Sequence, residues 1–273
     1  MKIHELKYSN TNTYLIEGKD GLLLFDTGWA GTFPMFCRAM GSLNIPVQDI
    51  DCILISHFHP DHCGIAQEIA DLGAVVTVMD VQKDSVHAAD GIFLREKHQE
   101  FKPIDDSMLR TVSISESRSF LKELGIDGEI LHTPGHSDDS ISLCLDDGSF
   151  FVGDLNPLYE LELHKGTPVE DSWKLLLARK PGTIYYGHAK THIFNTSDRV
   201  GTASSVAETC SDQNLHELVS KIMKLIDRGM PLDRIQKKTG ADAVFIEDVT
   251  RMYLTHKDVG VQGILDRIEI KGR

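Results

Sequence analysis

The amino-acid sequence predicts a layered α/β domain that is followed by a helical extension. Segments 51–55 and 74–79 have the apolar, β-branched composition of buried strands, and the stretch between them has apolar residues at helical spacing. Strands that alternate with helices are typical of sheets covered by helices. Towards the C-terminus the strand signals stop and helical periodicity continues. We therefore expect two parts, residues 1–200 and residues 201–273.

The other elements of the first part follow from apolar runs and turn residues. Segments 12–16 and 21–25 predict a hairpin, in which the second strand is almost entirely apolar and therefore buried. Segment 33–44 has apolar side chains three or four positions apart, which indicates an amphipathic helix. Further strands are predicted at 128–132, 140–145, 149–152 and 183–186, and further helices at 117–124 and 172–178.

The C-terminal part reads as helices throughout. Residues 212–228 form the longest predicted amphipathic helix, and three shorter helices follow at 232–239, 243–255 and 263–270. Short helices joined by a glycine turn superficially suggest a helix-turn-helix. The candidate recognition helix, however, carries Glu247 and Asp248, which are unfavourable next to a phosphate backbone. We therefore expect an extension that packs on the first part, shapes its pocket or forms a homodimer.

The most distinctive segment runs from His57 to His62 and supplies three imidazoles and one carboxylate within six positions. It follows a predicted strand and precedes a predicted helix, so it forms a loop at the carboxyl end of a strand, where open α/β sheets bind ligands. His57 and His59 are two residues apart and can reach one metal ion. Asp61 and His62 follow a change of direction and can reach a second.

This His-x-His-x-Asp-His pattern resembles the hallmark of the metallo-β-lactamase-fold hydrolases. The resemblance extends over about residues 1–195 and continues in segments 133–137, 151–154 and 186–188. It implies a four-layered αββα sandwich that carries the helical part as a C-terminal extension. It also implies three further metal ligands, in the order in which the family has them. The complete implied set is His57, His59 and His136 for the first metal, Asp61, His62 and His188 for the second, and Asp154 as the bridge.

This ligand set implies two divalent metal ions, with zinc as the expected metal and iron or manganese as alternatives. Each group of three ligands leaves an open position for water or substrate. A water shared by two cations has a lowered pKa, so we expect a metal-bound hydroxide to attack an electrophilic carbonyl or phosphoryl centre. Asp61 is expected to place this hydroxide or to accept its proton.

Several reactions remain open, because the metals alone do not choose the substrate. We favour a hydrolase that cleaves an ester-like bond, a lactone or a thioester, in a small molecule. A di-iron oxygen or nitric oxide reductase is disfavoured, since its relatives generally have glutamate where this chain has His59. An iron-dependent oxygenase, such as a persulfide dioxygenase, keeps the motif and stays an alternative. A regulatory or binding module that acts through the C-terminal helices is another.

The resemblance also suggests supporting parts. Asp26 is expected either to hold backbone or a ligand imidazole in place, or to bind its own backbone in a turn. In similar proteins, inserts after the strand predicted at 74–79 often cover the active site. Segment 80–115, which we interpret as helices with an intervening loop, is therefore our candidate lid. His87 and His98 lie within it and are expected to be solvated or capping residues.

Composition limits the partners and the compartment. The 273 residues, of which 41% are hydrophobic, can bury a sizeable core. The net charge of −13 disfavours nucleic-acid binding. No segment has the length of a membrane span or the pattern of a signal peptide, and the five scattered cysteines fit reduced thiols. We expect a cytoplasmic protein with a small-molecule substrate, and no nucleic-acid or membrane partner.

Overall fold

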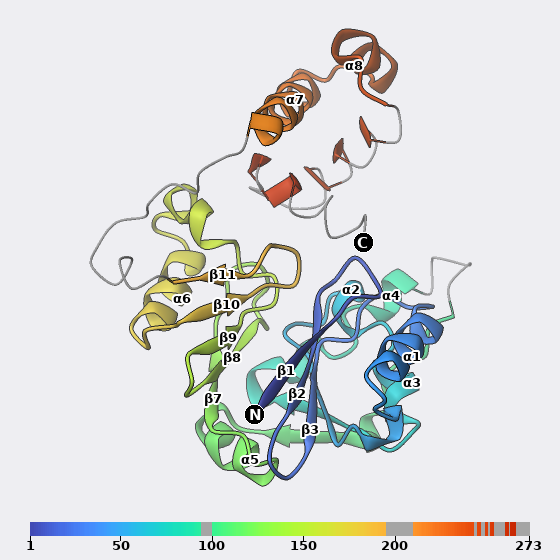
Figure 1. The fold of residues 1–273 in the computed structure, drawn as a ribbon, viewed down its shortest axis with the longest axis vertical. Coiled ribbons are helices and arrows are strands. Elements are labelled where there is room, and N and C mark those ends of the chain that lie inside the picture. The colour runs from blue at the N-terminus through green and yellow to red at the C-terminus, as the bar shows by residue number, and fades with distance from the viewer. Residues whose placement is uncertain are drawn as a thin grey trace.

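The computed structural model describes residues 1–93, 100–194 and 210–242, together with parts of 245–265. Two sheets enclosed by helices form one body, here called the sandwich, and α7 and α8 belong to a separate group of helices (Figure 1). The predicted boundary at residue 200 lies outside the described residues, and so does His98. The helices are α1 (Phe33–Ser42), α2 (Pro60–Cys63), α3 (Ala66–Ala70), α4 (Asp90–Phe93), α5 (Ser117–Glu123), α6 (Pro168–Leu177), α7 (Cys210–Asp227) and α8 (Leu232–Thr239).

The first sheet has six strands in the order of the chain. Its first three strands pair antiparallel, and β3 to β6 pair parallel, each through a crossover connection. Phe25 at the end of β3 lies opposite Leu54 at the end of β4, so Asp26 and the histidine loop leave the sheet at the same edge. The strands are β1 (Lys2–Leu6), β2 (Thr13–Glu17), β3 (Leu22–Phe25), β4 (Cys52–Leu54), β5 (Val75–Met79) and β6 (Leu109–Val112).

The second sheet has five strands in the order β11-β10-β9-β8-β7. Its central pair, β9 and β10, is parallel, with Phe151 opposite Tyr185. Asp154 and His188 each follow three residues after this pair, so both leave the sheet at one edge. The strands are β7 (Gly128–His132), β8 (Ile141–Leu145), β9 (Ser149–Phe151), β10 (Thr183–Tyr185) and β11 (His192–Ile193).

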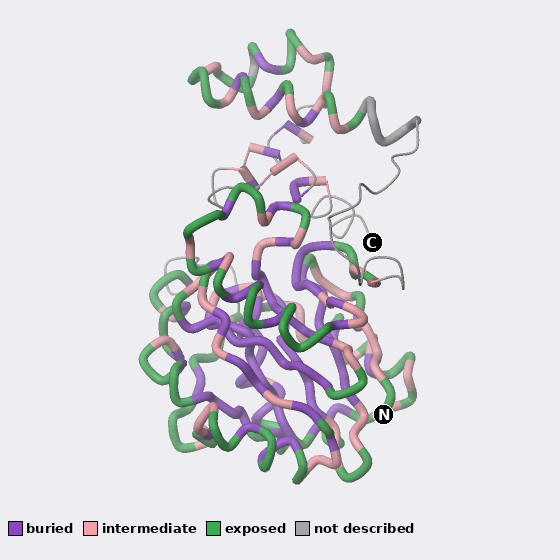
Figure 2. Tube along the Cα trace, turned by 90° about the vertical axis from the view of Figure 1, so that its left-hand side faces the viewer, coloured by how far each residue is buried: buried purple, intermediate pink, exposed green. Residues whose placement is uncertain are grey.

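Three buried clusters separate four layers. In β3, Leu24 packs towards α1 and α3, whereas its neighbours Leu23 and Phe25 pack between the two sheets, as alternation along a strand requires. A third cluster, around the fully buried Trp173, joins the second sheet to α6. Figure 1 shows the sheets between α1 and α3 on one side and α6 on the other, and Figure 2 shows the buried residues along the central strands. The predicted αββα sandwich is confirmed.

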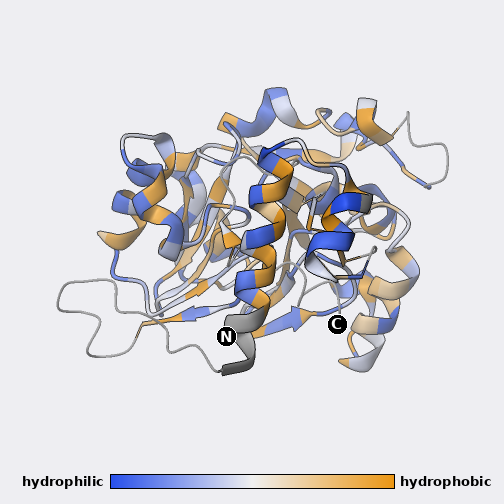
Figure 3. Ribbon diagram, turned by 90° about the horizontal axis from the view of Figure 1, so that it is seen from above, coloured by the Kyte–Doolittle hydropathy of each residue, from blue (hydrophilic) through white to orange (hydrophobic). Residues whose placement is uncertain are grey.

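The C-terminal helices have their own apolar cluster, built from residues between 218 and 265, with Val219, Ile222 and Ile235 fully buried. Hydrophilic and hydrophobic residues alternate along the helices in Figure 3, which views the molecule from the side of α7 and α8. One contact with the sandwich is the hydrogen bond that the Gly260 backbone N–H donates to the buried Glu160 (2.9 Å). Among the described residues, no helix has the length and apolarity that crossing a membrane requires.

Segment 80–115 differs from our prediction of helices with a loop. Its described residues form the strand β6, which pairs with β5, the helix α4 and three short helical turns: η2 (Asp80–Ser85), η3 (Asp106–Met108) and the start of η4 (Ile114–Glu116). Other 3-10 turns are η1 (Val47–Asp49) and η5 (Leu158–His164). His87 is exposed and bonds to Asp90 and Asp106. The lid role of this segment stays a prediction.

Candidate metal centre

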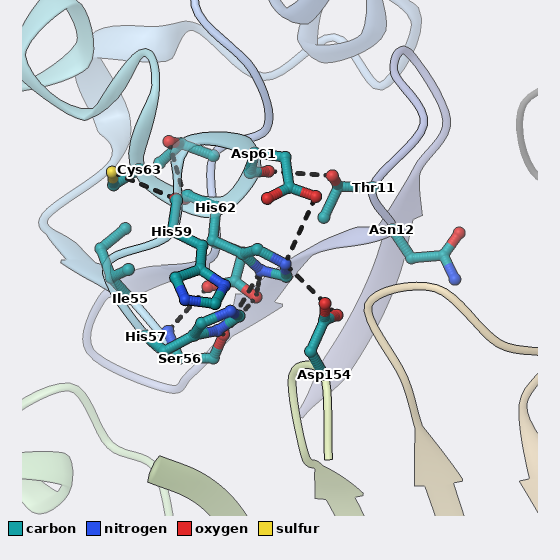
Figure 4. Close-up of polar contacts among 12 residues, drawn as sticks. Thr11, Asn12, Ile55, Ser56, His57, His59, Asp61, His62, Cys63 and Asp154 are labelled. Atoms are coloured by element: carbon teal, nitrogen blue, oxygen red, sulfur yellow. Dashed lines mark hydrogen bonds and ion pairs between the residues drawn. The ribbon is translucent and has the colours of Figure 1, made fainter. Parts of the chain in front are cut away.

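The histidine loop leaves β4 and turns into α2 within a few residues. Pro60 occupies the first turn of α2, where its fixed φ suits the helix and its missing N–H is not needed. His57 and His59 therefore precede the helix, with His59 in extended backbone as its N-cap, and Asp61 and His62 lie within it. In Figure 4 these four side chains converge on one region, which Asp154 approaches from the opposite sheet.

The other three ligand candidates come from loops at the carboxyl edge of the second sheet. His136 follows β7, Asp154 follows β9 and His188 follows β10. Gly153 has a φ of +54°, and a Cβ there would lie 2.5 Å from the Cβ and Oγ atoms of Ser56. Glycine at this position thus allows the two sheets to meet directly behind the ligands.

Two groups of candidate ligand atoms result, each with its atoms within 4.8 Å of one another. In the first group, His136 Nε2 lies 3.0 Å from His59 Nδ1, and the ring centroids of His57 and His59 are 4.4 Å apart. In the second, His188 Nε2 lies 2.7 Å from Asp61 Oδ2. The first group is His57, His59 and His136, and the second is Asp61, His62, Asp154 and His188.

Asp154 connects the two groups. Its Oδ2 atom lies 3.6 Å from Nε2 of His136 and 3.6 Å from Nε2 of His188, and its Oδ1 atom lies 3.3 Å from Nε2 of His62. A carboxylate with both oxygens between two clusters of imidazoles has the position that a bridging ligand needs. The structure thus brings together all seven residues that the sequence nominated, and their ligand role itself stays a prediction.

The buried polar atoms of this cluster fit metal ions. Among the described residues, the buried side-chain atoms without a hydrogen-bond partner include His57 Nε2, His62 Nε2 and Asp154 Oδ1. An unpaired buried polar atom costs free energy, so a native structure usually supplies it with a partner. Zinc, iron and manganese accept imidazole and carboxylate ligands. Such ions, bound by the two groups, would supply the partners that these three atoms lack.

The ionised carboxylates and the neutral His57 of the cluster also favour cations. Burial opposes ionisation of Asp154, but the charges of His188 and His62 outweigh it and hold the pKa of its carboxyl well below the usual value. Burial also opposes ionisation of Asp61, but the charge of His62 and the hydrogen bond with His188 outweigh it and lower the pKa of this carboxyl. Burial and the neighbouring His62 lower the pKa of His57, so its imidazole is neutral and has a lone pair to share.

Asp26 holds one ligand imidazole, which is the first of its two predicted roles. Its Oδ2 atom lies 2.8 Å from His62 Nδ1, and its oxygens accept hydrogen bonds from the N–H (2.7 Å) and hydroxyl (2.9 Å) of Ser56. Asp26 has a φ of +63°, an uncommon conformation for a residue other than glycine. The carboxylate keeps the proton of His62 on Nδ1 and leaves Nε2 directed at the site.

Gln82 and Asp139 tie the two ligand loops together, and sequence reasoning missed Gln82. The Nε2 atom of this fully buried glutamine lies 3.0 Å from the carbonyl oxygen of Ile55 and 3.1 Å from that of Asp139. Asp139 Oδ2 accepts a hydrogen bond from the Phe58 N–H (2.8 Å), and its other oxygen bonds to Ser137. A single glutamine after a strand gives no signal that it will bridge two loops.

The turn between β1 and β2 supports the second group. The Asn10 carbonyl oxygen lies 2.8 Å from His188 Nδ1, and the Thr11 hydroxyl donates to the carbonyl of Asp61 (2.9 Å). Asn12 donates through Nδ2 to the carbonyls of Tyr186 and Ala189, on either side of His188. The sequence marked this turn only as the start of a strand.

The cluster is accessible from one side. His57, His62, Asp154 and His188 are buried, whereas His59, Asp61 and His136 are only partly buried. Cys63, the last residue of α2, is 3% exposed in the core, and burial raises the pKa of its thiol. Its sulfur contacts the carbonyl of His59 (3.3 Å) and belongs to neither ligand group.

Comparison with protein families agrees with this geometry. The sequence model of the metallo-beta-lactamase superfamily matches residues 7–188, which include every candidate ligand. The chain belongs to this superfamily. The metallo-beta-lactamase superfamily consists mostly of metal-dependent hydrolases.

Two relatives among curated proteins share about 30% of the aligned residues with this chain. The beta-lactamase-like protein 2 homolog of Drosophila melanogaster is 29% identical over 186 residues, which are 65% of this chain and 58% of that protein. A probable metallo-hydrolase of Methanocaldococcus jannaschii is 30% identical over 154 residues, 56% of this chain and 70% of that protein. The match thus spans little more than half the length of the Drosophila relative.

Solved structures share the metallo-beta-lactamase fold. A metallo-beta-lactamase family protein from Thermus thermophilus superposes with a TM-score of 0.55 and 18% identity, over 99% of this chain and 94% of that chain. The protein TTHA1623, solved in a di-iron-bound form, gives a TM-score of 0.52 and 22% identity, over 71% of this chain and 94% of that chain.

Proposed function

We propose that this protein is a dinuclear metal-dependent hydrolase that cleaves a lactone or thioester bond in a small molecule. The observation that carries the proposal is the position of Asp154, whose two oxygens lie between two groups of imidazole nitrogens with unpartnered buried atoms. A mononuclear site would leave one of these groups without a partner.

His57, His59 and His136 would hold one cation, and Asp61, His62 and His188 the other, with Asp154 shared. A bound pair of divalent cations supplies Lewis acidity and lowers the pKa of a coordinated water towards neutrality. Zinc fits the imidazole and carboxylate donors and requires no redox chemistry. The di-iron form of TTHA1623 makes iron the alternative metal for this fold.

Asp61 is the carboxylate placed to take part in proton transfer. Its side chain is 18% exposed, whereas that of Asp154 is 2% exposed. The hydrogen bond with His188 and the adjacent charge of His62 keep Asp61 ionised and oriented. A substrate would approach on the accessible side, beside His59, Asp61 and His136, where Asp61 would place the attacking water or accept its proton.

The net charge and the chemistry of the site support the proposed substrate class. The chain carries a net charge of −13, which disfavours long polyanions such as nucleic acids. Lactones and thioesters have an electrophilic carbonyl. The thiolate of a thioester leaves with little protonation, and the alkoxide of a lactone would be stabilised by a bound cation until it is protonated. Ser56, whose hydroxyl lies 3.0 Å from His57 Nδ1, is buried behind the ligands and donates to Asp26. It cannot reach a substrate, so hydrolysis proceeds without a covalent intermediate on this serine.

Metal content per chain, measured by mass spectrometry on protein purified without chelator, tests the proposal. We expect about two zinc ions, with less metal in both His59→Ala and Asp154→Ala. Asp138→Ala, an exposed carboxylate next to the same loop, is the matched control and keeps the metal. A panel of lactones and thioesters then tests the activity. One iron per chain that Asp154→Ala leaves unchanged would overturn the dinuclear centre and point to the oxygen-dependent alternative.

A further inference from the structure

The C-terminal helices carry a groove of about 450 Å³ that is distinct from the metal centre. Four cationic side chains line it: Lys221, Lys224, Arg228 and Lys238. We call it the basic groove. Its volume lies within the range of small-molecule sites in proteins.

Helix geometry places these cations together. Lys221, Lys224 and Arg228 are spaced by three and four residues, so they share one face of α7 and its C-terminal end. The opposite face of α7 packs into the apolar cluster of the C-terminal helices through residues such as Ile222. Lys238 comes from the last turn of α8, and its carbonyl accepts a hydrogen bond from Lys221 Nζ (3.1 Å). The two helix ends therefore form one cationic wall.

Among the described residues, no carboxylate neutralises the charges of this wall. In the part of the chain that the structure describes, no carboxylate oxygen lies within 4.0 Å of a side-chain nitrogen of these four residues. The sandwich is different, because nine of its cations do have a carboxylate within that distance. These are Lys2, Lys7, Lys102, Arg110, Arg118, Lys122, Lys165, Lys174 and Arg179. Like charges held close together without counter-charges favour an anionic ligand.

The distribution of charge along the chain limits the size of that ligand. Residues 201–273 contain 11 basic and 11 acidic side chains, so the net charge of −13 falls entirely on residues 1–200. A small anion in the basic groove is surrounded by residues from the part 201–273, whose positive and negative charges balance. A long polyanion would extend from the groove into the field of the acidic part, which opposes it.

The other lining residues suggest what the anion is attached to. Ser220 and His216 add hydrogen-bond donors beside the cations, and Leu225 adds an apolar surface. Glu217 is the one acidic lining residue, and a carboxylate in a ligand site accepts hydrogen bonds from hydroxyl groups such as those of a sugar. We propose that the basic groove binds a nucleoside diphosphate or a similar sugar-linked polyphosphate, with its phosphates on the four cations.

Calorimetric titration of the full chain with ADP, with pyrophosphate and with inorganic phosphate tests this site. We expect one saturable site, with ADP tighter than pyrophosphate and inorganic phosphate weakest, and binding that weakens as salt increases. Lys224→Gln and Arg228→Gln should each raise the Kd for ADP about tenfold, because each removes a charge-assisted hydrogen bond. Both side chains are exposed, so the variants should keep the melting temperature of the parent chain.

Lys174→Gln on α6 is the matched control, since this lysine is exposed but already paired with Glu170 and Asp171, and it should leave the Kd unchanged. ADP binding that neither groove variant weakens would place the ligand elsewhere, for example at the metal centre, and overturn the proposal. Binding of a single-stranded oligonucleotide without any binding of ADP or pyrophosphate would also overturn it, in favour of a nucleic-acid surface.

Discussion

Asp26 Oδ2 lies 2.8 Å from Nδ1 of His62, and both side chains are at most 1% exposed. The carboxylate accepts the Nδ1 proton, so a cation that displaces the second proton of the imidazole finds the lone pair on Nε2, the atom directed at Asp154. Through this single hydrogen bond, a residue at the end of β3 decides which nitrogen of a ligand candidate is available to a cation.

Replacing Asp26 with asparagine should weaken zinc binding about 10- to 100-fold. Asparagine tolerates the positive φ of this position but does not fix the proton of His62 on Nδ1. Competition with a chromogenic chelator measures the affinity. Asp51→Asn, which alters an exposed carboxylate bonded to the Leu22 N–H, is the control. Equal affinities for both variants would contradict the role assigned to Asp26.

Replacing Gly187 with alanine should displace the bridging carboxylate. A Cβ at this position would lie 2.6 Å from Asp154 Oδ1 and 2.9 Å from His62 Cε1. We expect metal content to fall from about two ions to about one per chain, as in a site that has lost its bridging ligand. At Gly182 the nearest atom to a Cβ is 3.7 Å away, so Gly182→Ala should keep both ions. Full metal content in Gly187→Ala would show that Asp154 does not need its present position.

Replacing Gln82 with leucine should lower the free energy of unfolding by about 3 kcal/mol, since it leaves buried backbone groups without partners. The Met79 N–H donates to Gln82 Oε1 (3.2 Å), and the Ile55 and Asp139 carbonyls face its Nε2 atom. Urea denaturation of the metal-free protein measures the change. Gln48→Leu, on the surface, should stay within about 0.5 kcal/mol of the parent. A similarly small effect at Gln82 would mean that the two loops are joined by other contacts.

His87 should make segment 80–115 sensitive to pH. The hydrogen bond with Asp106, aided by Asp90, raises the pKa of His87 above its ordinary value of 6.5. Its stabilising contribution is therefore complete below about pH 6.5 and is lost as the pH rises through the folded-state pKa. His87→Gln should be less stable than the parent at about pH 5.5, by less than about 1 kcal/mol because the site is exposed, and equal to it at about pH 9. NMR titration of His87 gives the pKa directly, and a value at or below 6.5 would contradict the ion pairs.

The ligand candidates could be predicted from the sequence because their pattern is local. Four of them lie within six residues, and the other three follow strands whose apolar runs are easy to recognise. The strands β9 and β10 are parallel and in register, so Asp154 and His188 lie at the same edge of the sheet. Their proximity therefore follows from the directions of the strands and not from any side chain.

The parts that escaped prediction depend on tertiary contacts. In β6 only Val112 is buried, and Arg110 lies on the surface in an ion pair with Glu123, so the strand has no apolar alternation to detect. Gln82 resembles any polar residue after a strand until the fold brings Ile55 and Asp139 to it. The strands β1 and β11 were not predicted from the sequence either.

The ligand candidates are divided between the sheets: four come from the loop after β4 in the first sheet, and three from loops of the second. Cations at the centre would thus clamp the two halves of the sandwich together, much as a crosslink does. Because such ions bind only the folded chain, their free energy of binding adds to the barrier against separation of the sheets. The supply of metal in the cell would then govern how long each molecule resists proteolysis, as well as whether it is active.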